Sequence, residues 1–231
     1  MSSSGVVEAA REYARWESGG ATWLITDLPP EDDDEAVDIM RDHMIPYETM
    51  SVANGVPDDP TSVRCMLGFW RKTIGARCSL ACYELRGDSR TLVGVNICAP
   101  QKKGEIMSKA GLEGEKCLNI FKTVVYVESK CDVYSYLGLE ELLMAVGLCV
   151  RTEYRGLGLG QRILAAREKL CKALGLTATS TLFTGVASQK LADRCGFTTV
   201  AEASLSELAA AGLHYSPDDH RVLKQMVKKY T

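Results

Sequence analysis

The sequence lacks the features that mark membrane-spanning, exported and nucleic-acid-binding chains. None of its apolar runs approaches the ~20 residues that a membrane-spanning helix needs. Its N-terminus has neither the basic start nor the apolar block of a secretory signal. Its net charge of −3 provides no overall positive field to attract nucleic acid. We therefore expect a cytoplasmic protein with no membrane and no nucleic-acid partner.

Paired cysteines are also missing, although the chain of 231 residues contains nine cysteines. The count is odd, no C-x-x-C pair occurs, and most of the cysteines have apolar neighbours in the sequence. None of the three histidines has metal-ligand spacing to a cysteine, which argues against a zinc site. These patterns predict reduced, buried thiols and no metal ion.

Predicted strands and helices alternate along the chain, which indicates a mixed α/β fold. The sequence has no repeats, low-complexity blocks or obvious linkers, so we expect a single domain over residues 20–231. The preceding N-terminal segment, residues 1–19, could be flexible. Residues 118–136 fit a strand or a helix, and their length favours a helix. The predicted strands are 21–26, 75–85, 91–100, 141–150, 179–185 and a closing edge strand at 220–229, and the other predicted helices are 29–44, 161–175 and 187–197.

A glycine-rich stretch stands between a continuously apolar predicted strand and an amphipathic predicted helix. Its glycines, Gly156, Gly158 and Gly160, leave bare backbone N–H groups at the start of a helix, where the helix dipole also favours an anion. A Walker A loop is excluded because no Lys-Ser/Thr pair follows Gly160. The dinucleotide fingerprint is excluded because Gln161 stands where its third glycine should be. The stretch therefore predicts a phosphate site of another kind.

The six residues from Arg155 to Gly160 match the pattern Arg/Gln-x-x-Gly-x-Gly/Ala. This pattern resembles the acetyl-CoA signature of the GCN5-related N-acetyltransferase (GNAT) superfamily. A wider resemblance, from about residue 20 to the end, is to the insect arylalkylamine N-acetyltransferases. It is carried by four stretches in matching order and spacing: MIPYETM (44–50), LCVRTEYRGLGLGQRIL (148–164), FTGVASQKLADRCGF (183–197) and HRVLKQMVKK (220–229). The resemblance implies the α/β GNAT fold, in which helices flank a mixed central β-sheet.

The resemblance further implies that acetyl-CoA is the acetyl donor. In the family the loop amides hold the pyrophosphate of coenzyme A, and the strand before the loop pairs with its pantetheine arm. Backbone N–H groups of that strand also stabilise the negative charge that develops on the thioester carbonyl. The cofactor-binding residues implied in this sequence are Leu148, Cys149, Val150, Arg155, Gly156, Leu157, Gly158, Leu159, Gly160, Gln161 and Ser188.

Acetyl transfer to an amine needs a base, because an amine is mostly protonated at neutral pH. From the residues alone, Glu48 is an exposed acid in a loop. However, Pro46 and Glu48 match a Pro-Asp-Glu-Pro-like stretch whose glutamate is the general base in the related enzymes. Tyr47 and Thr49 depart from that stretch, so the loop shape and the substrate preference stay open.

Three further side chains are catalytic candidates through the resemblance. Thr184 and Ser188 match two hydroxyl positions near the leaving thiolate of coenzyme A, although both could instead cap a helix. His220 lies near a histidine that affects activity in some relatives, and it could instead be a surface or capping residue. No nearby His/Asp pairing supports Cys149 or Cys195 as a nucleophile, and the resemblance implies direct transfer in a ternary complex without an acyl-cysteine.

The sequence thus predicts a monomeric, acetyl-CoA-dependent N-acetyltransferase that acts on the primary amine of a small arylalkylamine or related biogenic amine. Two alternatives stay open. One is a non-catalytic acyl-CoA-binding protein of the same fold, and the other is an enzyme that acts on a polyamine, agmatine or a protein amine. Five aromatic residues could line an amine pocket or belong to the core: Phe69, Trp70, Tyr126, Tyr134 and Tyr136.

Overall fold

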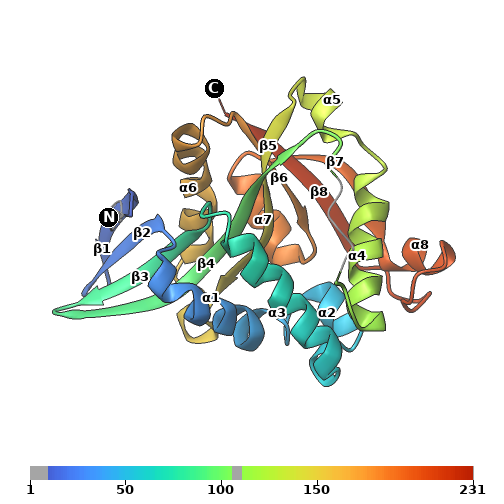
Figure 1. Ribbon diagram of the computed structural model, residues 1–231, viewed down its shortest axis with the longest axis horizontal. Coiled ribbons are helices and arrows are strands. Elements are labelled where there is room, and N and C mark those ends of the chain that lie inside the picture. The colour runs from blue at the N-terminus through green and yellow to red at the C-terminus, as the bar shows by residue number, and fades with distance from the viewer. Residues whose placement is uncertain (1–9, 106–110, 231) are drawn as a thin grey trace, which may run out of the picture.

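The computed structural model describes residues 10–105 and 111–230, and its frame is one eight-stranded mixed sheet (Figure 1). The strand order is β1-β2-β3-β4-β5-β6-β8-β7, and β5–β6 is the parallel pair among antiparallel ones. The strands are β1 (Glu12–Ser18), β2 (Ala21–Asp27), β3 (Leu80–Arg86), β4 (Ser89–Lys102), β5 (Glu141–Val150), β6 (Ala178–Phe183), β7 (Thr198–Ser204) and β8 (Val222–Lys229).

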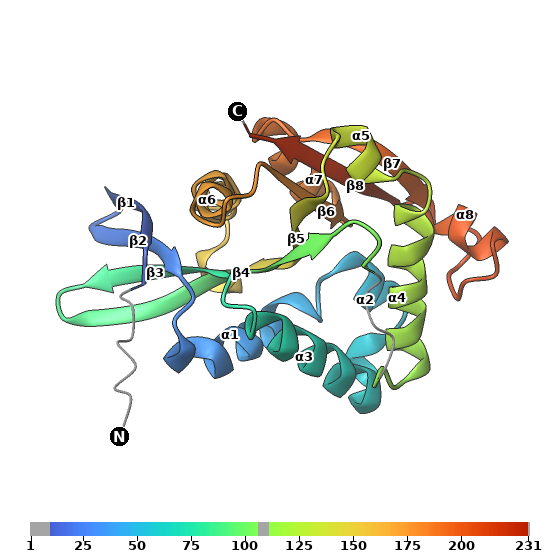
Figure 2. The same ribbon diagram turned by 45° about the horizontal axis from the view of Figure 1, so that its top comes forward.

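Helices cover both faces of this sheet. Figure 2 shows α1 and α3 on one face and α6 on the other, and α4 packs beside β7 and β8. A π-helical turn (Met40–Met44) continues α1. The α-helices are α1 (Asp33–Ile39), α2 (Thr49–Ala53), α3 (Pro60–Ile74), α4 (Glu115–Glu128), α5 (Val133–Leu137), α6 (Leu159–Ala173), α7 (Val186–Arg194) and α8 (Leu205–Ala210), and 3-10 turns span Pro30–Asp32, Val56–Asp58 and Thr152–Tyr154. The expected mixed α/β fold with a single domain is confirmed.

Two helices differ from the sequence-based expectation. The predicted helix 118–136 is two helices, because the Asp132 side chain accepts hydrogen bonds from the backbone N–H groups two and three residues on and starts α5. Helix α3 was not predicted, although Asp59 caps it and Pro60 occupies its first turn. In both cases a capping aspartate is the signal that marks the helix start.

The prediction that residues 220–229 form an edge strand is wrong. β8 lies between β6 and β7 and pairs antiparallel with both, so β7 is the edge strand on this side. Leu223, Met226 and Val227 of β8 are buried, as expected for a strand inside a sheet. Burial on both faces explains why its polar and apolar residues alternate only imperfectly.

Strand β1 belongs to the sheet, whereas the sequence predicts a domain that begins at residue 20. β1 pairs with β2 across a turn at Gly19 and Gly20, whose φ angles of 62° and 72° suit a tight hairpin. The rings of Trp16 and Trp23 stack across the pair, with their centroids 6.3 Å apart. The N-terminal segment thus contributes a strand, and residues 1–9 lie outside the described part of the chain.

Strands β5 and β6 separate after a short paired stretch. β5 pairs with β4 from Glu141 to Val150, but β6 pairs with β5 at Leu143↔Thr179 and Met144↔Ser180 alone among the described residues. From residue 145 to 150 the edge of β5 that faces β6 is therefore free of strand pairing. Such an edge can take up a ligand that offers backbone-like hydrogen bonds.

Candidate active site

The glycine-rich loop leads into α6. Gly156 and Gly158 have φ angles of 84° and 76°, a left-handed conformation that residues with a side chain rarely adopt. Position 160 favours glycine for a different reason, because a Cβ there would lie only 3.2 Å from Leu191 Cδ1 of α7. The loop is exposed, and no side chain caps the start of α6. Its N–H groups and the helix dipole therefore offer an anion site.

Arg155 joins this loop to the segment that precedes Glu48. Its Nε donates to Val150 O at 3.2 Å, and its Nη2 donates to His43 O. The guanidinium also lies 4.7 Å from the ring centroid of Tyr47. Arg155 thus fixes the glycine loop in place and, because it stays exposed, adds positive charge beside the anion site.

Leu148, Cys149 and Val150 form the end of β5, in the part that β6 does not pair. Cys149 is buried, and burial raises the pKa of its thiol to about 12. Burial also raises the pKa of Cys195. Both thiols are therefore neutral near pH 7, which argues against an acyl-cysteine step.

Glu48 is the N-cap of α2, and both of its carboxylate oxygens accept hydrogen bonds. Oε1 accepts from Met50 N at 2.9 Å, and Oε2 accepts from Ser51 N at 2.7 Å and Ser51 Oγ at 2.8 Å. The side chain is half-buried, not the exposed loop acid that the residues alone suggest. Three hydrogen bonds hold the carboxylate in one orientation.

Two short distances show that the segment around Glu48 faces the opening between β5 and β6. The sulfur of Met44, four residues before Glu48, lies 3.4 Å from the point where a Cβ on Gly147 of β5 would be. Thr49 Oγ1 lies 3.6 Å from the corresponding point on Gly185, in the loop after β6. The segment from Met44 to Thr49, which carries Glu48, therefore runs from the unpaired end of β5 to the loop after β6.

Tyr215, which no sequence motif marks, and Arg221, which was not among the candidate site residues, share the electrostatic environment of Glu48. Burial raises the pKa of Tyr215, and the charge of Glu48 adds to that rise. The hydrogen bond to Asp219 raises the pKa of Arg221, and Glu48 again contributes. Tyr215 Oη and Thr123 Oγ1 of α4 share a hydrogen bond of 2.7 Å. Helix α4 and the entry to β8 therefore lie close to Glu48.

Ser188 lies in the first turn of α7, near the Glu48 segment. Its hydroxyl donates to Gly185 O at 2.8 Å. Ser188 therefore takes part in capping α7, which was the alternative to a catalytic role. Ser188 Oγ and Thr49 Oγ1 lie 3.8 and 3.6 Å from the same Cβ point on Gly185. Thr184 precedes this glycine and is half-buried. The structure thus brings Ser188 and Thr184 to the segment that carries Glu48.

The remaining candidate residues have separate surroundings. His220 is exposed just before β8, and its Nδ1 lies 3.2 Å from Ser206 Oγ of α8. Of the aromatic candidates, Trp70 is buried and donates to a β5 carbonyl at 3.1 Å, so it belongs to the core. Tyr136 is 58% exposed, whereas Tyr134 lines a cavity between α5 and the sheet.

Arg167 of α6 is a buried cation that the sequence did not mark. Its Nε donates to Asn96 Oδ1 of β4 at 2.5 Å, and its Nη1 donates to Thr181 Oγ1 of β6 at 2.7 Å. Since β5 lies between β4 and β6, this side chain crosses β5 near the point where β5 and β6 separate. Arg167 therefore links β4 to β6 at the base of the opening between β5 and β6.

The described residues contain neither a metal site nor a membrane-spanning helix. Across residues 10–105 and 111–230, no group of three or more His, Cys, Asp and Glu side chains is arranged to hold a metal ion. Within those same residues, no helix is long and apolar enough to cross a membrane. All nine cysteines are free thiols, six of them buried and three half-buried.

Comparison with known proteins identifies this arrangement of sheet and glycine loop. Residues 131–197 match the family model described as the acetyltransferase (GNAT) family. The Aedes aegypti protein named arylalkylamine N-acetyltransferase 7 is 28% identical, with 98% of each chain covered and a TM-score of 0.88. The chain has the GNAT fold. The resemblance to the insect arylalkylamine N-acetyltransferases is confirmed, and the comparisons support an enzyme.

Two further GNAT-fold structures share this architecture at lower identity. Arylalkylamine N-acetyltransferase 2 of Aedes aegypti is 18% identical with a TM-score of 0.77. A Drosophila melanogaster polyamine N-acetyltransferase, which forms N-acetylagmatine, is 17% identical with a TM-score of 0.73. Each match covers 90% of this chain and 99% of the other. A search of curated proteins gives no match. GNAT acetyltransferases in general use acetyl-CoA as the donor.

Proposed function

We propose that this GNAT-fold protein transfers the acetyl group of acetyl-CoA directly to the primary amine of a small molecule, with Glu48 as general base. The position of Glu48 carries the proposal. Its segment runs from the unpaired end of β5 to the loop after β6, and Arg155 joins this segment to the glycine loop of α6. A base, a free strand edge and an anion site are thereby held together. The names of the structural relatives support an arylalkylamine or a polyamine as acceptor.

The residues around the opening suit acetyl-CoA, which when bound supplies the activated acetyl thioester. The N–H groups of the glycine loop and the dipole of α6 suit its pyrophosphate. The free edge of β5 from Leu148 to Val150 suits its amide-containing arm, and the N–H groups there can stabilise negative charge on the thioester carbonyl. Leu157 and Val186, which expose 57% and 65% of their surface, offer apolar contacts for a ligand to cover.

Proton transfer assigns roles to the polar side chains. Glu48 accepts the proton that the acceptor ammonium must lose, directly or through a water molecule, and its charge attracts the cationic amine beforehand. Ser188 donates to the leaving thiolate once its hydroxyl turns from Gly185 O. Thr184 and His220 stay predictions from the resemblance, because neither makes a contact that assigns it a step.

Glu48→Gln tests the proposal, because glutamine keeps the shape and a capping oxygen but removes the base. We expect kcat, followed as thiol release from acetyl-CoA at saturating amine, to fall about 10²–10⁴-fold. Asp59→Asn is the matched control, since Asp59 caps α3 through the same bonds, from Thr61 N, Ser62 N and Ser62 Oγ. That variant should keep its kcat.

Two results would count against the proposal. Unchanged turnover in Glu48→Gln would remove Glu48 as the base while leaving the transferase in place. The wild-type protein should release thiol with at least one member of a panel of aryl, imidazole, guanidino and polyamine acceptors. No release with any of them would refute the transferase and favour the acyl-CoA-binding alternative.

A further inference from the structure

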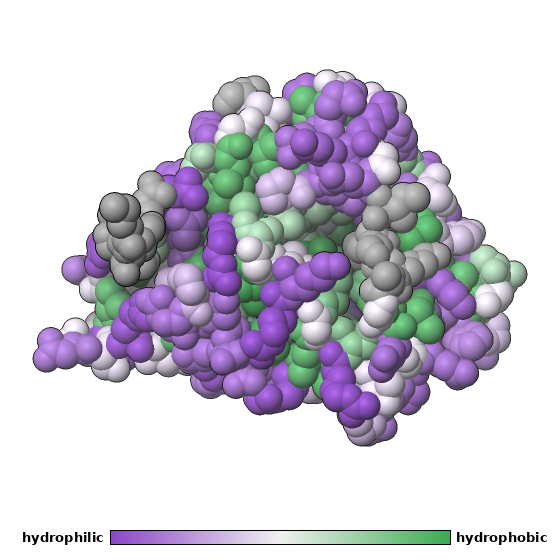
Figure 3. Space-filling view, in the orientation of Figure 1, coloured by the Kyte–Doolittle hydropathy of each residue, from purple (hydrophilic) through white to green (hydrophobic). Residues whose placement is uncertain are grey.

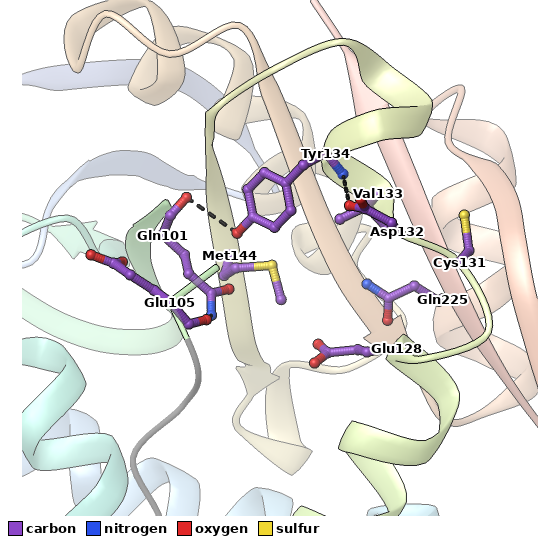
Figure 4. Close-up of a pocket in the computed structure, with 9 residues that line it drawn as sticks. All are labelled: Gln101, Glu105, Glu128, Cys131, Asp132, Val133, Tyr134, Met144 and Gln225. Carbon is purple, nitrogen blue, oxygen red and sulfur yellow. Dashed lines mark hydrogen bonds between the residues drawn. The ribbon is translucent and has the colours of Figure 1, made fainter. Parts of the chain in front are cut away.

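A polar cavity lies where the C-terminal end of α4 meets α5 and the sheet. Its volume is about 160 Å³, and β4, β5 and β8 supply the rest of its walls (Figure 4). Figure 3 shows that the face of the molecule seen in Figure 1 is hollowed, with apolar residues within the hollow.

Three carboxyl groups line the cavity, and no lysine, arginine or histidine of the described residues does. Two are already paired, because Glu105 Oε2 accepts from Lys102 N at 2.9 Å, and Asp132 caps α5 and lies 4.0 Å from Lys103 Nζ. Glu128 has no such partner in the described part of the chain, and burial raises its pKa to about 7. Figure 4 shows its carboxyl group turned into the cavity.

A second wall of the cavity carries an unpaired amide oxygen. Gln225 of β8 is fully buried, and its Nε2 donates to Ser180 Oγ of β6. Its Oε1 has no hydrogen-bond partner among the described residues. Buried polar atoms are nearly always paired, so this oxygen marks a place for a donor. Gln225 Oε1 and the Glu128 carboxylate together suit a hydrogen-bond donor of positive charge.

Strands β5 and β8 run from the cavity toward the surroundings of Glu48. On β5, Met144 lines the cavity and Gly147, which is level with the Glu48 segment, follows three residues later. On β8, Gln225 lines the cavity four residues after Arg221, which is in the field of Glu48. At about 3.3 Å per strand residue, the two routes put the cavity roughly 10–13 Å from the surroundings of Glu48.

We propose that this cavity binds a second, cationic group of the acceptor. The Glu128 carboxylate and Gln225 Oε1 accept hydrogen bonds from an ammonium or guanidinium group while the reacting amine lies at Glu48. The inference rests on the proposed function and names its acceptor class, an aliphatic amine with two basic ends. A span of roughly 10–13 Å, less two hydrogen bonds of about 2.9 Å each, leaves about 4–7 Å between the two nitrogens and suits a spacer of about three to five carbons.

Matched acceptors test this assignment. Diamines from 1,3-diaminopropane to 1,6-diaminohexane are compared with the monoamines of the same chain length, by thiol release from acetyl-CoA. In the wild type, kcat/KM for the best diamine should exceed that for its monoamine about ten- to hundredfold, as expected for hydrogen bonds to a charged group. Glu128→Gln should abolish this preference by raising the KM of the diamine, with the KM of acetyl-CoA unchanged. Glu115→Gln, which removes an exposed charge from the other end of α4, should keep the preference.

A second variant and the controls separate the possible outcomes. Glu128→Asp keeps the charge but withdraws it by one methylene, so it should move the optimum to a longer diamine. Monoamine acetylation with no diamine preference, or a preference that survives Glu128→Gln, would overturn the assignment and leave the transferase intact. An optimum length that does not move in Glu128→Asp would also count against it. No acetylation of any amine would refute the proposed function instead.

Discussion

The carboxyl group of the half-buried Glu128 has a measurable consequence for stability. It lines a cavity that holds no cationic side chain of the described residues. Glu105, Asp132 and Tyr134 face the same cavity, so its other titratable groups are acids and a phenol. We predict that Glu128→Gln, which replaces the carboxyl group by a neutral amide of the same shape, raises the free energy of unfolding above pH 7.

The magnitude follows from the pKa. Burial raises the pKa of Glu128 from 4.5 to about 7, and each pKa unit corresponds to about 1.4 kcal/mol. The ionised group therefore lowers the free energy of unfolding by about 3 kcal/mol. Below about pH 4.5 the carboxyl group is protonated in both the folded and the unfolded chain, so this loss is absent there. The loss grows as the pH rises from 4.5 to about 7 and is constant above.

Urea unfolding of the wild type and Glu128→Gln at several pH values between 4.5 and 8 measures this difference. It should rise from near zero at pH 4.5 to about 3 kcal/mol at pH 8, or roughly 6–12 °C in Tm for a domain of this size. Glu115→Gln, an exposed site on the same helix, should differ from the wild type by less than about 0.5 kcal/mol at every pH. A difference that does not depend on pH, or a loss of stability at pH 8, would refute the reasoning.

Three further predictions concern other parts of the molecule. Gly158→Ala should lower the Tm and raise the KM of acetyl-CoA, because alanine at a φ of 76° is strained by about 1–2 kcal/mol; an unchanged KM would argue that the loop does not bind the donor. Arg167→Lys should lower the free energy of unfolding by about 1–3 kcal/mol, because one ammonium group cannot hydrogen-bond both Asn96 Oδ1 and Thr181 Oγ1. Urea unfolding measures the change, and an unchanged free energy would contradict this reasoning. The thiols of Cys65 and Cys117 lie 2.7 Å apart, so diamide, which takes up two electrons and two protons, should join them. Thiol titration of the unfolded protein should then lose two of nine thiols, and Cys65→Ser should abolish that loss.

Local chemistry made much of the fold and of the glycine loop predictable. The apolar run at 141–150 forms β5 over the predicted residues, and the capping aspartates Asp59 and Asp132 could have located α3 and α5. Gly156 and Gly158 stand where the backbone is left-handed. Such effects act within a few residues, so a single sequence reports them.

The neighbours of each strand were less predictable. The pattern at 220–229 indicates a strand, but it does not say that β7 lies outside it. In the same way, the hairpin of β1 and β2 depends on a Gly19-Gly20 turn, which local periodicity does not mark. Periodicity reports which side of a strand is buried, whereas pairing depends on residues far along the chain.

The sequence by itself determined most of the helices and strands, the anion-binding loop and, through its resemblance, the expected base. The tertiary structure alone decided what surrounds two acids. Met44 and Thr49, in the segment that carries Glu48, lie close to Gly147 and Gly185. Glu128 is an ordinary helix-end glutamate in the sequence, but in the structure it lines the same cavity as Gln225. The physical reason is that burial, charge partners and a raised pKa arise where α4, β5 and β8 come together, and no local pattern encodes that meeting.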